Sequence, residues 1–216
     1  MIDVVKHIEA VQREVGEGTL AAGEAHAIRL RRRYDAPIED VWDALTDPER
    51  IGRWFLPISG DYRIGGRYQF EGNAGGEIVA CERPHRLRAT WVYGEPSSPA
   101  DVSEVELRLK SSEADATTLE LEHVAIVPEE FWTMYGPGAV GVGWEGGLLG
   151  LALHLSGGSV GDPIAWQSSD EGRDFNTRSS EAWGAASTAA GEDPAAVATM
   201  VANTTQFYAP DPEAPS

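Results

Sequence analysis

The chain has 216 residues, of which 42% are hydrophobic, so it is long enough to bury a sizeable core. It carries 35 acidic residues against 17 Lys and Arg, a formal net charge of -18. This balance argues against binding to nucleic acid or to an anionic membrane surface, because both need clustered basic residues. A single cysteine, Cys81, excludes a disulfide within the chain, and the sequence contains neither a signal peptide nor an apolar run of about 18 residues, so we expect a cytoplasmic protein.

The N-terminal segment predicts a helix followed by a strand. Its apolar residues recur at helical spacing: Val4, Val5, Ile8, Val11 and Val15. We therefore expect a helix over residues 2–15, ended by Gly16 and Gly18, and then a strand over residues 25–34. Alternation along that strand favours an exposed or edge position for its arginines, which are Arg29, Arg31, Arg32 and Arg33.

Two short helices and an antiparallel meander are predicted next. Pro37 suits the first turn of one helix, and Asp47 precedes a second short helix that carries Trp54. Glycine-rich turns then separate segments that alternate between apolar and other residues. The strands predicted from these segments span residues 58–64, 67–71, 77–82, 86–93, 103–110 and 117–124.

The most apolar helix of the chain is predicted to begin at Pro137. Its apolar residues recur at spacings of three and four: Val140, Trp144, Leu148, Leu151 and Leu155. A helix this apolar must be buried, and we expect it against the concave face of the sheet. Its many glycines indicate close packing or free space beside it. Two further helices are expected over residues 170–190 and 195–208, followed by a frayed end at residues 210–216.

A series of runs in this order carries a family resemblance. The run YDAPIEDVWDALTDPERIGRWFLP at residues 34–57 is followed by GDYRIGGRYQF, GGEIVACERPHRLRATW, VELRL, TTLELEH and GVGWEGGLLGLALHL. The series resembles the SRPBCC superfamily of START-related, helix-grip proteins. Within it, the chain is similar to bacterial stand-alone members of the branch named after the C-terminal domain of the activator of the heat-shock-protein-90 ATPase.

The resemblance implies an α+β helix-grip fold, in which a curved antiparallel sheet wraps around a long helix. It implies a helix-grip domain over residues 25–157, an N-terminal helical segment over residues 1–24 and a two-helix extension over residues 158–216. It also implies a cavity between helix and sheet that holds lipids, polyketides or other apolar molecules in the superfamily. The two C-terminal helices could cover the mouth of this cavity or form a homodimer interface, and the sequence does not choose between these roles.

The residues predicted to line this pocket are Trp54, Phe55, Phe70, Glu77, Trp91, Tyr93, His123, Trp144 and Leu148. Each aromatic residue could equally fill the core, since aromatic side chains dominate core packing. An empty apolar cavity of roughly 300 Å³ would cost about 7 kcal/mol, which is a large share of ordinary protein stability. Such a cavity is therefore small, wet or occupied.

Motifs for catalysis, metals and nucleotides are absent from the sequence. The five histidines are scattered, no paired cysteines occur, and the glycine-rich segments are not followed by Gly-Lys-Ser/Thr. We therefore predict no cofactor and no metal. His123 and Glu77 could act as acid or base, although a core or rim histidine and a solvated carboxylate are the commoner roles, and Cys81 is predicted to be a buried strand residue rather than a nucleophile.

Three functions remain open. The favoured one is binding of a small apolar, aromatic or lipid-like molecule, as a carrier or sensor. The second, implied by the resemblance, is a stress-response role as a regulator of a chaperone ATPase or another protein-interaction module. The third is a cyclase, dehydratase or hydrolase that acts in the same cavity.

Overall fold

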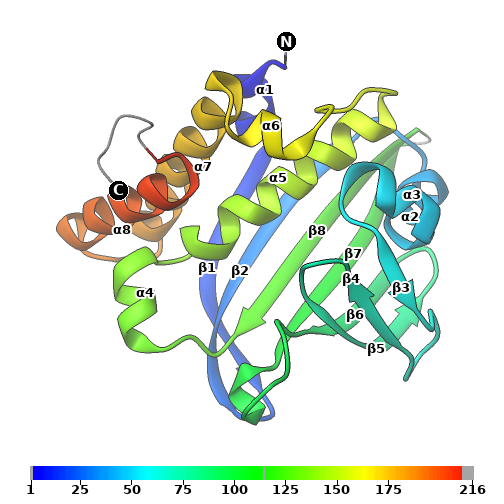
Figure 1. Ribbon diagram of the computed structural model, residues 1–216, viewed down its shortest axis with the longest axis horizontal. Helices are drawn as coiled ribbons and strands as arrows, with labels where there is room; N and C mark the ends of the chain where they lie inside the picture. Colours follow the sequence, from blue (N-terminus) through cyan, green and yellow to red (C-terminus); the bar gives the residue numbers. More distant parts are fainter. Residues whose placement is uncertain (1, 114, 211–216) are drawn as a thin grey trace.

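A curved antiparallel sheet forms the frame of the computed structural model, which describes residues 2–113 and 115–210 (Figure 1). Eight strands in these residues pair in the order β1-β2-β8-β7-β6-β5-β4-β3, so β1 and β3 lie at the two edges. The strands are β1 (Val11–Leu20), β2 (Gly23–Tyr34), β3 (Ile58–Gly60), β4 (Arg67–Phe70), β5 (Gly75–Glu82), β6 (Arg86–Trp91), β7 (Ser103–Glu113) and β8 (Ala116–Ala125).

The helices pack mainly on one side of this sheet, with α5 lying across its concave face (Figure 1). They are α1 (Val4–Glu9), α2 (Ile38–Thr46), α3 (Pro48–Trp54), α4 (Glu129–Tyr135), α5 (Gly138–Leu155), α6 (Pro163–Gln167), α7 (Asp170–Ala189) and α8 (Pro194–Tyr208), with a short 3₁₀ helix, η1 (Pro99–Asp101). The predicted α+β helix-grip architecture, with α7 and α8 as the two-helix C-terminal extension, is confirmed. Residues 211–216, where a frayed end was predicted, lie outside the described residues.

The core lies between α5 and the centre of the sheet. Alternation along β2 and β8 directs Leu30, Leu119 and Leu121 to the concave face, where they are at most 3% exposed. Leu151 of α5 is fully buried in the same cluster. This cluster positions α5 on the sheet, and Leu119 and Leu121 also border the cavity described below.

The convex face carries rows of paired charges. Arg29 of β2 bonds Glu122 of β8 at 2.6 Å, and Arg108 of β7 bonds Glu120 at 2.8 Å. The arginine-rich strand was expected to be exposed or at an edge. β2 lies between β1 and β8, so it is not an edge strand, while Arg31 and Arg33 on it are exposed. Its arginines are accommodated because neighbouring strands place glutamates beside them.

The predicted helix over residues 2–15 is wrong beyond Glu9. The segment from Val11 forms β1, which pairs with β2 from Val11↔Arg32 to Leu20↔Gly23. Positions 11 and 15 share a face in a strand as well as in a helix, so the spacing of Val11 and Val15 fits both structures. The long hydrogen-bond ladder with β2 stabilises a strand here rather than a helix. The glycines at positions 16 and 18 are also poor helix formers.

Helices α7 and α8 pack on the side of α5 that faces away from β3, β4, β5 and β6 (Figure 1). Trp183 of α7 is buried against Gly141 of α5, where an added Cβ would lie 2.2 Å from the indole ring. On another side of α5, an added Cβ at Gly150 would lie 2.5 Å from the Trp54 carbonyl oxygen. Gly141 and Gly150 therefore permit close approach on two sides of α5, which is one of the two alternatives expected for its glycines, while an added Cβ at Gly146 would meet open space.

Candidate functional site

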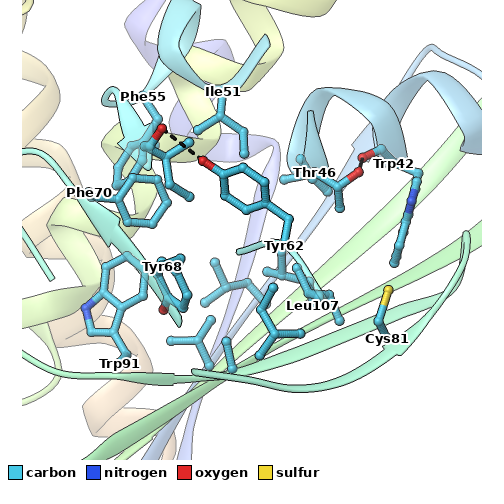
Figure 2. A pocket seen from close by; sticks show the side chains of 18 of the residues that line it. Trp42, Thr46, Ile51, Phe55, Tyr62, Tyr68, Phe70, Cys81, Trp91 and Leu107 are labelled. Carbon is cyan, nitrogen blue, oxygen red and sulfur yellow. Dashed lines mark hydrogen bonds between the residues drawn. The ribbon is translucent and has the colours of Figure 1, made fainter. Parts of the chain in front are cut away.

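An apolar cavity of about 580 Å³ lies between α5, the short helices α2 and α3, and the concave face of the sheet (Figure 2). Its volume falls within the range of small-molecule binding pockets, which is about 300–1,000 Å³. The aromatic side chains in its wall are Trp42, Trp54, Phe55, Tyr62, Tyr68, Phe70, Trp91 and Trp144. The aliphatic ones are Leu45, Ile51, Ile58, Ile64, Ile78, Leu87, Ala89, Val105, Leu107, Leu119, Leu121 and Leu148.

Strand alternation builds the floor of the cavity. Alternate residues of β4, β6, β7 and β8 supply it, as Tyr68 and Phe70 do on β4. Helix α3 forms the opposite wall. The Asp47 side chain caps this helix by accepting hydrogen bonds from the backbone N–H groups of Glu49 and Arg50, which fixes where the helix begins.

One end of the cavity is a continuous aromatic wall. Phe55 meets Phe70 edge-on with 5.0 Å between ring centroids, and Phe70 lies 5.5 Å from Trp91. Trp91 lies 4.8 Å from Trp144 of α5. Rings from α3's C-cap, β4, β6 and α5 thus meet at distances typical of favourable aromatic pairs.

Several polar atoms of the wall already have partners inside the protein. Trp54 Nε1 donates to the Ala44 carbonyl at 2.9 Å, and the Tyr68 hydroxyl donates to the Thr90 carbonyl at 2.7 Å. The hydroxyls of Thr46 and Tyr62 donate to the carbonyls of Trp42 and Ile58, drawn as dashed lines in Figure 2. These groups therefore present apolar surface to a bound molecule.

His123 lies behind this wall rather than in it. Trp144 Nε1 donates to His123 Nδ1 at 3.1 Å, and His123 Nε2 lies 2.9 Å from Ser103 Oγ. The Ser103 hydroxyl donates in turn to the Trp91 carbonyl at 2.6 Å. Burial lowers the pKa of His123 to about 4, so the imidazole is neutral at pH 7.

The cavity reaches solvent beside the loop between β3 and β4 and the end of β5. The side chains of Tyr62, Ile64 and Cys81 are exposed there and also border the cavity. Figure 2 shows the Tyr62 ring extending over the cavity toward Phe55. The strand predicted over residues 58–64 ends at Gly60, and the loop that replaces its second half forms this mouth.

Comparison with family models assigns the chain to a protein family. Residues 35–155 match the model of the family described as Activator of Hsp90 ATPase homolog 1-like protein. The chain belongs to this family. No curated protein matches the chain.

Solved structures match between 60% and 83% of the chain. The crystal structure of CalU16 from Micromonospora echinospora is 43% identical, with a TM-score of 0.63, and the match covers 82% of this chain and 98% of CalU16. The solution structure of CalU16 gives 42% identity and a TM-score of 0.67, covering 83% and 96% of the two chains. The protein MLL2253 from Mesorhizobium loti shares the fold at 23% identity and a TM-score of 0.52, over 60% of this chain and 96% of its own.

The structure brings six of the nine predicted pocket residues to the cavity of this family member. They are Trp54, Phe55, Phe70, Trp91, Trp144 and Leu148. That a ligand contacts them stays a prediction. The sequence reasoning missed Trp42, Tyr62 and Tyr68, although Tyr68 stands two residues before Phe70 and strand alternation could have found it.

The other three predicted residues do not line the cavity. Glu77 is exposed because its neighbour Ile78 takes the inward position on β5. Tyr93 is 64% exposed because β6 ends at Trp91. His123 is screened by Trp144, and both of its nitrogens are engaged, so an acid or base role in the cavity has no geometric support for His123 or Glu77. Cys81 is exposed, not buried as predicted.

Residues 2–113 and 115–210 contain no group of three or more His, Cys, Asp or Glu side chains that could hold a metal ion. None of the helices they form is long and apolar enough to cross a membrane. The described residues of α7 and α8 do not contribute to the cavity wall, so nothing supports a role for these helices in covering its mouth.

Proposed function

We propose that the protein binds a small apolar molecule in the cavity beneath α5, as a cytoplasmic carrier or sensor. The observation that carries this proposal is a cavity of about 580 Å³ walled by aromatic and aliphatic side chains, in which the Trp54 indole and the Tyr68 hydroxyl donate to carbonyls of the protein itself. Pockets of this size and composition are the usual sites for small ligands. Shape and apolar contact would select the ligand.

The free energy of an unfilled cavity also favours a bound ligand. At about 24 cal/mol per Å³, an empty dry cavity of 580 Å³ would cost about 14 kcal/mol, comparable with the whole stability of a domain. Filling it with water would place on the order of 20 molecules against a wall with few free hydrogen-bonding groups. An apolar ligand removes both costs.

Native mass spectrometry and a fluorescent probe test this proposal. Protein purified without detergent should carry a bound small molecule, or should bind N-phenyl-1-naphthylamine, a neutral dye that fluoresces in apolar sites. A ligand at 100 times its Kd should add about 2.7 kcal/mol to the free energy of unfolding. For a chain of this size that raises Tm by roughly 5–10 °C. Absence of both a bound mass and dye binding would overturn the proposal.

A further inference from the structure

We infer that the ligand of this cavity is an anionic amphiphile, whose apolar part lies under α5 and whose negative group lies at the mouth, where Arg63 and Arg83 border the cavity. This inference rests on the proposed function and adds the chemical class of the ligand. It follows from where charge is placed around the cavity.

Arg63 and Arg83 are the only charged side chains among the described residues that line the cavity, and both are cationic. The chain has 35 Asp and Glu against 17 Lys and Arg, so a cavity wall whose charged residues are two arginines runs against its composition. The carboxylates that pair with these arginines, Asp61 and Asp43, are not part of the wall. The wall therefore offers an anion two guanidinium groups and no carboxylate of its own.

The two arginines belong to separate segments that both border the cavity. Arg63 lies in the loop between β3 and β4, and Gly65 N donates to the Ile78 carbonyl of β5 at 2.8 Å. Ile78 N donates back to the Gly66 carbonyl at 3.0 Å. Arg83 directly follows β5. Figure 2 labels Tyr62, which precedes Arg63, and Cys81, which stands two residues before Arg83, among the side chains that line the cavity.

Both guanidinium groups are available to a ligand. Arg63 Nε bonds Asp61 at 2.7 Å and Arg83 Nη2 bonds Asp43 at 3.0 Å, with the two arginine side chains 72% and 65% exposed. Exposed pairs of this kind contribute little to stability, so a ligand anion can share or replace the carboxylate at low cost. The remaining N–H groups make no hydrogen bond to the described residues, and a guanidinium fork suits the oxygens of a carboxylate, sulfonate or phosphate.

The interior of the cavity favours the apolar part of the ligand. The hydroxyls of Tyr62 and Tyr68 and the indole of Trp54 all donate to backbone carbonyls. An anionic group buried beside them would therefore lose its water without gaining a donor from these three side chains. The charged group of a bound molecule is best placed at the mouth, where the arginines and solvent meet.

A matched pair of dyes tests this inference. 8-Anilino-1-naphthalenesulfonate has the ring system of N-phenyl-1-naphthylamine plus a sulfonate, so the ratio of their Kd values isolates the anion. In the variant with Arg63→Gln and Arg83→Gln together, the sulfonate dye should bind about tenfold more weakly, while the neutral dye should change less than about twofold. Arg67→Gln, on an exposed β4 position outside the cavity wall, is the control and should change neither.

Competition separates the head-group chemistries. Dodecanoate, dodecyl phosphate and dodecanol should each displace the neutral dye, with both anions stronger than the alcohol and weakened by added salt. An unchanged ratio of dye affinities in the double variant, or an alcohol as strong as the acids, would overturn the inference and leave the proposed function intact. Failure of the neutral dye to bind the native chain would overturn the proposed function and the inference with it.

Discussion

Trp144 and His123 are joined by a hydrogen bond in which the indole Nε1 donates to the imidazole Nδ1 at 3.1 Å. Because Nδ1 accepts, the neutral imidazole carries its proton on Nε2, which donates to Ser103 Oγ at 2.9 Å. This chain of bonds orients the tryptophan that closes the aromatic wall, and it requires the imidazole to be neutral.

The first prediction concerns the pH dependence of stability. His123 has a pKa of about 4 in the folded protein, against an ordinary value of 6.5. The unfolded chain therefore takes up the proton first, and stability that is fully present above pH 6.5 is lost as the pH falls toward 4. Between pH 7.5 and pH 5 this group alone should remove on the order of 2 kcal/mol from the free energy of unfolding.

The variant His123→Gln isolates that contribution. Its amide oxygen can accept from Trp144 while its NH₂ donates to Ser103, but it does not titrate. Urea unfolding of both proteins at pH 7.5 and pH 5 should show a smaller loss of stability in the variant. Equal losses in the two proteins would show that His123 is not held neutral.

The second prediction uses two adjacent glycines of α5. Gly147 borders the cavity, where an added Cβ would lie 3.8 Å from Phe55, while Gly146 has no atom within 4 Å of an added Cβ and lies outside the wall. Gly147→Leu should place its side chain in the cavity and weaken dye binding by at least about tenfold. Gly146→Leu brings the same gain in helix propensity and should leave the dye affinity unchanged. Fluorescence titration measures both, and equal effects would argue against binding beneath α5.

The third prediction concerns a buried ion pair that joins β1 to α5. Arg13 Nε and Nη2 each bond the Glu145 carboxylate at 2.6 Å, and the glutamate side chain is only 1% exposed. Glu145→Gln should cost about 3–5 kcal/mol in chemical unfolding, because it leaves the arginine charge buried without its partner. Asp174→Asn, which breaks an exposed pair with Arg178, should cost less than about 0.5 kcal/mol. Similar costs for the two variants would contradict this assignment.

The fourth prediction tests the strand β1. An added Cβ at Gly18 would lie 2.7 Å from Val124 Cγ1, whereas at Gly16 the nearest atom is Arg29 Nη1 at 3.8 Å. Gly18→Val should therefore destabilise the protein by about 1–3 kcal/mol through overpacking. Gly16→Val should be neutral or stabilising, since valine favours strands. If thermal unfolding gave the two variants the same Tm, β1 would not pair as described.

Periodicity predicted the elements whose partners lie close in sequence or whose apolar face is wide. The helix that carries Trp144 and Leu148 was predictable because a helix this apolar has to be buried. The strand β1 was not, because Val11 and Val15 fit two periods and only the distant ladder with β2 decides between them. Helix propensity is a weak signal against a long-range ladder.

The candidate site was predictable only in part for a related reason. Phe70 and Trp91 face the cavity as strand alternation requires. Tyr93 continues that alternation, but β6 ends at Trp91, and strand ends are the least certain part of a sequence prediction. Tyr62 could not be placed, since it lies in a loop whose path depends on backbone bonds to β5.

The exposed position of Cys81 at the mouth has a practical consequence. It is the single thiol of the chain and it borders the cavity. A maleimide fluorophore would therefore attach at one position, beside the entrance, without any cysteine having to be removed first. Such a labelled protein would report in real time when a molecule enters or leaves, and would turn the chain into a reagentless optical biosensor for its own ligand.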